Sequence, residues 1–224
     1  MRRFLGDNGL SVFFGAIFLV TIAAQSWAGQ RAVNAERAEH GERALSWGGY
    51  LVSPDFAGAV LENWQSEFLQ FSFFVVATVW LVQRGSNESK PPHDPGLDSD
   101  EEQQVGAHSP ADAPRWAKVD GLRRTIYENS LLLVMGAIFF ASWAGQSLGN
   151  WRTYNEDRAS HDLPEVGWGT YVRLADFWEK TLQNWQSEFL AVGTMVVFTI
   201  YLRQRGSPES KPVGAPHTET GSSG

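Results

Sequence analysis

The sequence of 224 residues contains no cysteine. Disulfide bonds, thiolate catalysis and cysteine-ligated metal sites are therefore excluded, although the compartment is not revealed. A concentrated basic patch is also missing, which argues against nucleic-acid binding. There is no nucleophile triad, Walker loop or dinucleotide fingerprint. The sequence thus predicts a protein that is not an enzyme and that holds no cofactor or metal ion.

Long uninterrupted apolar runs are missing too, since none reaches the ~20 residues that cross a bilayer. Apolar segments of about 15 residues do occur, at 10–24, 68–82, 131–144 and 189–202. The net charge of −7 and the mildly negative mean hydropathy resemble those of a soluble acidic protein, but these averages hide the segregation. Ten tryptophans and fourteen phenylalanines form a heavy aromatic load, and aromatic side chains collect at membrane interfaces.

The sequence contains an internal duplication. Residues 2–92 align without a gap with residues 123–213, and 41 of these 91 positions are identical. Each copy contains the heptad Asn-Trp-Gln-Ser-Glu-Phe-Leu, at 63–69 and at 184–190, followed by an apolar run and the tetrad Gln-Arg-Gly-Ser. Two long copies with a spacer indicate a duplicated unit and not a solenoid of short repeats.

Residues 1–28 resemble a secretory signal peptide, with a basic start, an apolar stretch and Ser26-Trp27-Ala28 as a cleavage-like site. The same pattern recurs at 123–149, inside the chain, where a signal peptide cannot lie. A transmembrane helix explains both copies.

We therefore expect an all-α protein, a bundle of four transmembrane helices made of two tandem parallel helical hairpins. In the first hairpin the helices are predicted at about 8–40 and 53–84, and both extend beyond the membrane on the outer side. The predicted domains are a first membrane repeat (1–92), an acidic disordered linker (93–121), a second membrane repeat (122–213) and a disordered tail (214–224). The rival fold is a soluble four-helix protein.

The orientation follows from the lysines and arginines. Eleven lie at the ends and in the central linker, and six lie in the loops 29–55 and 150–176. By the positive-inside rule both termini are cytoplasmic, and the protein is expected to be a multi-pass membrane protein. Its partners would be the lipid bilayer and either a second copy or another membrane protein.

Polar side chains at one depth form the candidate site. Gln25 lies 17 residues from Asn8, and Glu67 lies 17 residues from Arg84, so each is ~25 Å from the inner boundary of a hydrocarbon core ~30 Å thick. The candidate cluster consists of Gln25, Arg31, Asn63, Gln65, Glu67, Gln146, Arg152, Asn184, Gln186 and Glu188.

Two interpretations of the cluster stay open. Glu67 and Glu188 are ionised and held by Arg31 and Arg152 as structural ion pairs, or they serve a transport or ligand site, since an acid within a bilayer marks a function by default. The carboxylate–histidine pairs 36/40 and 157/161 have a spacing that allows metal binding, although such pairs on a wet helix end are ordinarily surface charge pairs.

Several segments together resemble a known family. They are Arg2-Arg3-Phe4-Leu5 with Asn8, the Asn34-x-Glu36-x-x-x-His40-Gly41 segment, the heptad and Gln-Arg-Gly-Ser-x-Glu-Ser-Lys. They are similar to a bacterial family of uncharacterised, internally duplicated four-helix integral membrane proteins. The resemblance implies an inner-membrane location and supplies no activity. The expected function is a structural, scaffold or envelope-stress membrane protein without turnover. The alternatives are a small transporter or channel at the Glu67/Glu188 level and, more distantly, a membrane enzyme.

Overall fold

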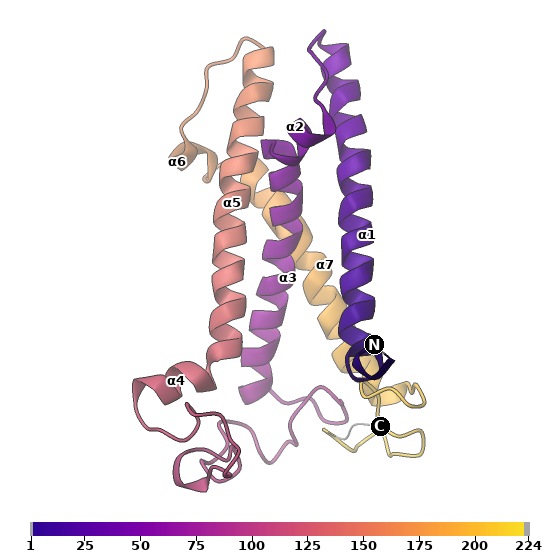
Figure 1. Ribbon diagram of the computed structural model, residues 1–224, viewed down its shortest axis with the longest axis vertical. Helices are drawn as coiled ribbons and strands as arrows, with labels where there is room; N and C mark the ends of the chain where they lie inside the picture. The colour runs from indigo at the N-terminus through magenta and orange to yellow at the C-terminus, as the bar shows by residue number, and fades with distance from the viewer. Residues whose placement is uncertain (1, 222–224) are drawn as a thin grey trace. The chain divides into compact units, whose positions relative to one another are not determined.

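A computed structural model describes residues 2–221, and within this range the chain contains helices and no strand (Figure 1). The four long helices are α1 (Arg2–Glu39), α3 (Pro54–Trp80), α5 (Ser130–Ser160) and α7 (Ala175–Tyr201). The short elements are α2 (Trp47–Leu51), the 3-10 turn η1 (Gly106–His108), α4 (Leu122–Glu128) and α6 (Trp168–Tyr171). The all-α class predicted from the sequence is confirmed.

The bounds of these elements recur at the offset of the sequence repeat, 121 residues. The pairs are the ends of α1 and α5 at Glu39 and Ser160, the starts of α2 and α6 at Trp47 and Trp168, and the ends of α3 and α7 at Trp80 and Tyr201. Contacts divide the chain into two units. Unit 1 comprises Met1–Leu61 and Gly145–Tyr171, and unit 2 comprises Glu62–Ala144 and Val172–Gly224.

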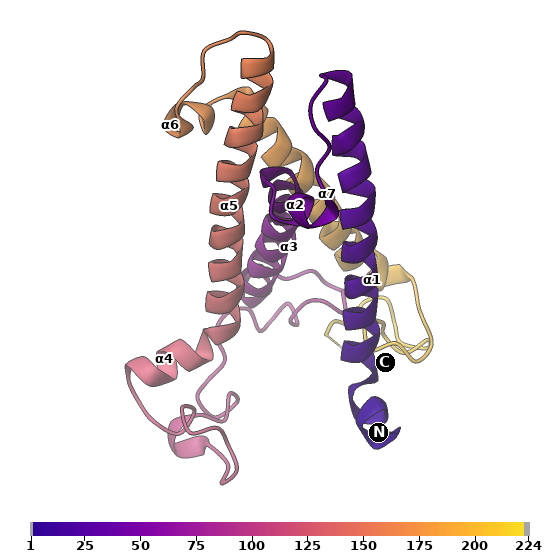
Figure 2. The same cartoon turned by 45° about the horizontal axis from the view of Figure 1, so that its top comes forward.

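An asparagine interrupts the helix at the same place in both repeats. Asn8 leaves helical geometry (φ −128°, ψ 18°), and its Nδ2 donates to the Phe4 carbonyl at 3.0 Å. Asn129 separates α4 from α5, and its Nδ2 donates to the Thr125 carbonyl at 2.8 Å. Such a side chain competes with the backbone for the helical acceptor. α1 therefore starts before Asn8, where the first helix was expected to begin, and bends there instead (Figure 2).

In unit 1 the loop after each long helix folds back along that helix (Figure 1). Asn34 closes the first loop with two bonds, since its Nδ2 donates to the Leu45 carbonyl at 2.9 Å and its Oδ1 accepts from the Leu45 amide at 2.7 Å. Asn155 makes the same two bonds with Val166, at 2.9 and 3.0 Å. The side-chain amide satisfies the backbone groups that a turn leaves open. This local pairing fixes where each chain segment turns back.

The returning segments carry α2 and α6 onto the long helices. The indole N–H of Trp47 donates to the Ser26 hydroxyl at 3.2 Å, and that of Trp168 donates to the Ser147 hydroxyl at 3.1 Å. Tyr50 in α2 is only 4% exposed. A Cβ atom at Gly29 would overlap its hydroxyl, so this contact requires glycine.

Two glycines of α5 allow close packing against the first turns of α3 within unit 1. A Cβ on Gly149 would lie 3.4 Å from the Gly58 Cα, and one on Gly145 would lie 2.5 Å from the Leu61 Cδ1. Gly145 and Gly149 form the Gly-x-x-x-Gly pattern by which membrane helices approach closely. This pattern was not among the features predicted from the sequence.

Large apolar side chains are exposed along the long helices, and several polar side chains are buried. Leu10 (74%), Val20 (68%) and Phe140 (65%) are exposed on the long helices, while Gln65 and Gln146 are fully buried. Within residues 2–221, α1 (from Arg3) and α5 are the two helices that are long and apolar enough to cross a membrane. Contiguous exposed apolar surface of this kind marks a membrane or partner interface.

The linker and the tail make specific contacts within unit 2. Lys90 bonds to the Gly96 carbonyl and to Asp98. Arg124 of α4 pairs with Asp100 and, at 2.5 Å, with Glu128. These bonds lower the pKa of Asp98 and Asp100, because a carboxylate that accepts charged hydrogen bonds holds its proton weakly. The disorder expected for 93–121 and 214–224 stays a prediction.

Candidate site at the two heptads

The two heptads contact each other in unit 2, one from α3 and one from α7. The indole N–H of Trp185 donates to the Gln65 Oε1 at 2.7 Å. The Asn184 Nδ2 donates to the Glu62 Oε1 at 2.9 Å, and the Phe73 and Phe189 rings meet edge to face with centroids 5.8 Å apart. Identical sequences thus form one polar interface between two helices.

Identical residues take different roles in this interface. Gln65 is fully buried, whereas Gln186, the equivalent residue of the second heptad, is exposed. Asn63 is exposed, whereas its equivalent Asn184 is half-buried and bonded to the other helix. The interface is therefore asymmetric, although the two heptads have the same sequence.

Two acidic residues approach each other at this level. Glu188 is half-buried, interacts with the Ser66 hydroxyl and lies close enough to Glu67 for repulsion between the carboxylates. Glu67 itself is exposed. The structure brings the two glutamates singled out in the sequence to one place.

Five aromatic rings of unit 2 pack beside the heptads. Trp143 of α5 stacks on Phe139 and Phe177, with centroids 5.8 and 6.1 Å away. The same indole meets Trp178 and Trp185 of α7 at 6.0 and 6.2 Å. Such pairs add about 0.5–1.5 kcal/mol each beyond burial. We refer to these five residues as the aromatic cluster.

Three buried polar atoms in this region have no hydrogen-bond partner within the described part of unit 2. They are the Gln65 Nε2, the Trp143 Nε1 and the Thr181 Oγ1. Thr181 lies one turn from Phe177 and one turn from Trp185, on the face of α7 that carries the aromatic cluster. Buried polar atoms left unpaired commonly bind an ordered water or a ligand group. Trp143, Thr181 and Glu62 were not singled out from the sequence, because none of them repeats in the other copy.

The remaining candidate residues belong to unit 1. Gln25 is half-buried, and the Arg31 guanidinium lies 4.3 Å from the ring centroid of Trp27. Gln146 is fully buried, and neither of its amide atoms has a partner among residues 2–221. Arg152 is exposed and lies near Glu156. The ion pairs expected between these arginines and the two glutamates stay predictions.

Both copies of the Gln-Arg-Gly-Ser segment form the same turn. The Ser89 hydroxyl accepts from the Gln83 amide at 2.8 Å, and the Ser210 hydroxyl accepts from the Gln204 amide at 2.9 Å. In the second turn the ammonium of Lys211 is buried, and its nitrogen lies within hydrogen-bond distance of four backbone carbonyls, those of Gly85, Pro216, His217 and Glu219, at 2.6 to 3.2 Å. Burial and the neighbouring Arg203 lower the pKa of Lys211.

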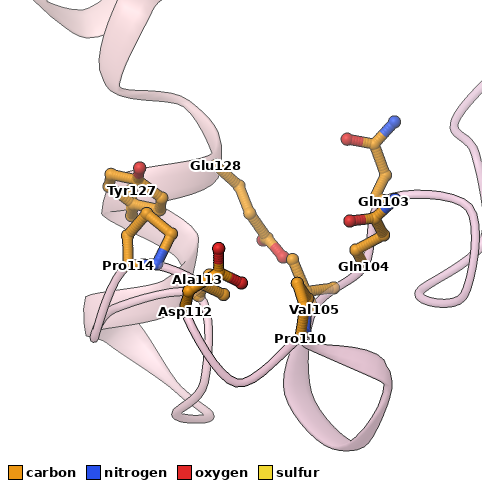
Figure 3. Close-up of a pocket in the computed structure, with 10 residues that line it drawn as sticks. Gln103, Gln104, Val105, Pro110, Asp112, Ala113, Pro114, Tyr127 and Glu128 are labelled. Atoms are coloured by element: carbon orange, nitrogen blue, oxygen red, sulfur yellow. The ribbon is translucent and has the colours of Figure 1, made fainter.

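A hollow of about 430 Å³ lies in the linker, and its wall includes Asp112, Tyr127 and Glu128 (Figure 3). The Glu128 side chain points toward Val105, between the chain segments that carry Gln104 and Asp112. Glu128 is bonded to Arg124 one turn earlier in the same helix, and Arg124 in turn bonds to Asp100 of the linker. The titratable side chains in its lining are the carboxyl groups of Asp112 and Glu128 and the phenol of Tyr127.

The carboxylate–histidine pairs on the long helices are simple local contacts. The His40 ring nitrogen lies 3.0 Å from the Glu36 carbonyl oxygen, and the His161 Nδ1 lies 3.7 Å from the Asp157 carboxylate. Within residues 2–221 there is no group of three or more acidic, histidine or cysteine side chains that would hold a metal ion.

Comparison with known proteins gives a family and no activity. No curated protein and no solved structure matches the chain. One family model matches, a domain of unknown function designated DUF6766, and the match runs from residue 1 to residue 222. Since it extends over nearly the entire chain, the protein belongs to the DUF6766 family.

Proposed function

We propose that this protein is a multi-pass membrane protein that works as a scaffold in a bacterial inner membrane and catalyses no reaction. In this proposal α1, α3, α5 and α7 each cross the bilayer, as two parallel hairpins made by duplication. Both termini and the linker are cytoplasmic. The polar ends of the helices and the turns α2 and α6 project from the outer side.

The membrane location in this proposal rests on which side chains are exposed and which are buried. Apolar side chains are exposed along α1, α3, α5 and α7, whereas the polar side chains of Gln65, Gln146 and Thr181 are fully buried. In water each exposed leucine or phenylalanine would forgo about 1.5–3 kcal/mol of burial free energy. In a bilayer the same surface faces hydrocarbon, and buried polar groups bind helices to each other.

α3 and α7 have more polar first halves than α1 and α5, because they carry the heptads. Their second halves are apolar, and exposed residues such as Phe73, Trp80 and Phe198 lie there. α3 and α7 have 27 residues each, which corresponds to ~40 Å of helix, longer than the ~30 Å hydrocarbon core. Each helix can thus cross the core with its polar start at the outer boundary.

The absence of turnover is supported by how the heptad level is filled. Trp185 bonds to Gln65, Asn184 bonds to Glu62, and Trp143 packs on Trp185. Direct bonds and stacked rings occupy the space that a substrate would need. A scaffold is expected to show this filling, and a transporter is expected to show a wet passage.

One observation favours transport as the second candidate. Glu67 and Glu188 lie near each other at this depth, and the Gln65 Nε2 and Thr181 Oγ1 are buried without partners in unit 2. A pair of acids beside unpaired polar atoms is an arrangement that proton or cation relays use. Replacement of both glutamates by glutamine, with growth profiled across ions, pH and toxic compounds, separates the two functions. If the variant is as stable as wild type but fails to support normal growth under one of these conditions, transport is favoured.

Topology is the direct test of the membrane proposal. Reporter fusions after residue 45 and at residue 105 should give an external and a cytoplasmic signal, respectively. A cytoplasmic signal at 45 contradicts the arrangement. Recovery of the protein in the aqueous fraction without detergent would support the soluble four-helix fold instead.

A further inference from the structure

Three adjoining hollows in unit 2 run from α3 and α7 to the first Gln-Arg-Gly-Ser turn. The first is an apolar groove of about 390 Å³ between the second halves of α3 and α7, with Phe74, Ala77 and Val196 in its wall. This volume lies within the ~300–1,000 Å³ of typical ligand sites. The groove is long enough to involve two helical turns of both helices.

The groove continues into the polar turn. A second hollow, of about 490 Å³, shares Phe74, Thr78, Glu88 and Ser89 with the groove and extends to Pro91. A third, of about 550 Å³, shares Pro91 and is lined by Arg84, His93, Thr218 and Thr220. The three hollows thus adjoin through shared lining residues, and the third contains Arg84, His93 and two threonine hydroxyls.

The charges at the rim suit a phosphate group. Arg84 and His93 are exposed, and Arg84 forms no ion pair with any residue in 2–221. The Thr220 hydroxyl accepts from the Gly85 amide at 2.8 Å, which places it at the turn. An arginine fork with hydroxyl neighbours is a common phosphate-binding set.

Glu88 lies where the groove meets the turn, and it needs a donor. Its Oε1 is buried and has no hydrogen-bond partner among residues 2–221. Burial and the neighbouring Glu209 raise the pKa of Glu88. A hydroxyl of a ligand headgroup would satisfy this oxygen.

We propose that this composite site binds one anionic phospholipid, with an acyl chain in the groove between α3 and α7 and the phosphate on Arg84 and His93. The inference rests on the proposed membrane location, in which Arg84 marks the inner boundary. An acyl chain then lies at hydrocarbon depth and the phosphate at headgroup depth. Cytoplasmic leaflets offer such lipids, and basic pockets between helix ends bind their headgroups.

The repeat offers a matched control. Arg205 stands at the position equivalent to Arg84, is exposed, and belongs to none of the three hollows. Ala77 lines the groove, and its equivalent in the second copy is Phe198. Ala77→Phe therefore introduces a residue that the other repeat already carries, and it fills the groove.

The test measures binding to the full-length protein purified in detergent, by native mass spectrometry and by thermal shift. Phosphatidylglycerol, phosphatidylcholine and glycerol phosphate are the probes. Phosphatidylglycerol should bind wild type and Arg205→Gln equally, and about tenfold more weakly to Arg84→Gln, the loss of roughly one charged hydrogen bond. Ala77→Phe, with circular dichroism like that of wild type, should lose phosphatidylglycerol binding.

Equal weakening in Arg84→Gln and Arg205→Gln would overturn the site in favour of unspecific charge attraction. Full binding of glycerol phosphate would overturn the lipid and indicate a free anion. Equal binding of phosphatidylcholine and phosphatidylglycerol would overturn the preference for an anionic headgroup. A protein that is soluble without detergent would overturn both this site and the membrane proposal, whereas a detergent-requiring protein without lipid binding would overturn the site alone.

Discussion

The bond between Trp185 and Gln65 should stabilise the contact between the two heptads measurably. Trp185→Phe removes the indole N–H and leaves the Gln65 Oε1 buried and unpaired, which costs about 1–3 kcal/mol. The smaller ring also leaves a gap beside Trp143 and Phe139, which adds about 1 kcal/mol. We expect a total loss of about 2–4 kcal/mol of the free energy of unfolding.

Gln65→Leu should cost less, about 1 kcal/mol, because it also removes the Nε2 that has no partner within unit 2. In the double variant both polar partners are replaced by apolar groups, so the loss should fall about 1–2 kcal/mol short of the sum. Gln186→Leu is the matched control, since this glutamine is exposed in the other heptad, and it should change stability by less than about 0.5 kcal/mol.

The assay is unfolding in mixed micelles of a mild detergent and sodium dodecyl sulfate, followed by far-ultraviolet circular dichroism, because tryptophan fluorescence would change with the substitution itself. Losses that add within about 0.5 kcal/mol in the double variant would refute the bond. An equally large effect of Gln186→Leu would show that the heptads do not meet in the asymmetric way described.

Three further predictions concern other parts of the chain. Gly149→Val should destabilise the protein by about 1–3 kcal/mol in the same assay, because the side chain meets the backbone of α3, while Gly149→Ala should be tolerated. Glu67→Gln and Arg31→Gln should each cost about 1–3 kcal/mol if the expected ion pair exists, and the double variant should cost less than their sum, so additive losses would rule the pair out. The bond between Arg124 and Asp100 lowers the pKa of that carboxyl. The bond should therefore stabilise the linker at pH values above the ordinary aspartate pKa, about pH 4, and it should be lost as the pH falls further and Asp100 is protonated. Hydrogen exchange of residues 99–106 at pH 7 and pH 2.5, expressed as protection relative to the intrinsic rate at each pH, measures this, and a lack of protection at both pH values would support a disordered linker.

The sequence by itself predicted the helical class, and it contains the local signals that interrupt the helices, although no interruption was predicted from them. Asn8 and Asn129 bend or end a helix, and the loops after the first long helix of each repeat close on Asn34 and Asn155. These features are local, since each depends on a side chain and a backbone group within 4 to 11 residues. The repeat made them visible because the same residue appears twice at one offset.

The tertiary structure decided which of two identical residues is used. Gln65 and Gln186, or Asn63 and Asn184, have the same neighbours in sequence, and only packing in unit 2 buries one of each pair and bonds it to the other helix. The repeat also hid what differs between the copies. Thr181, for which the first copy has no equivalent threonine, and the groove rim at Arg84 depend on side chains brought together from distant segments, and no local pattern records such a meeting.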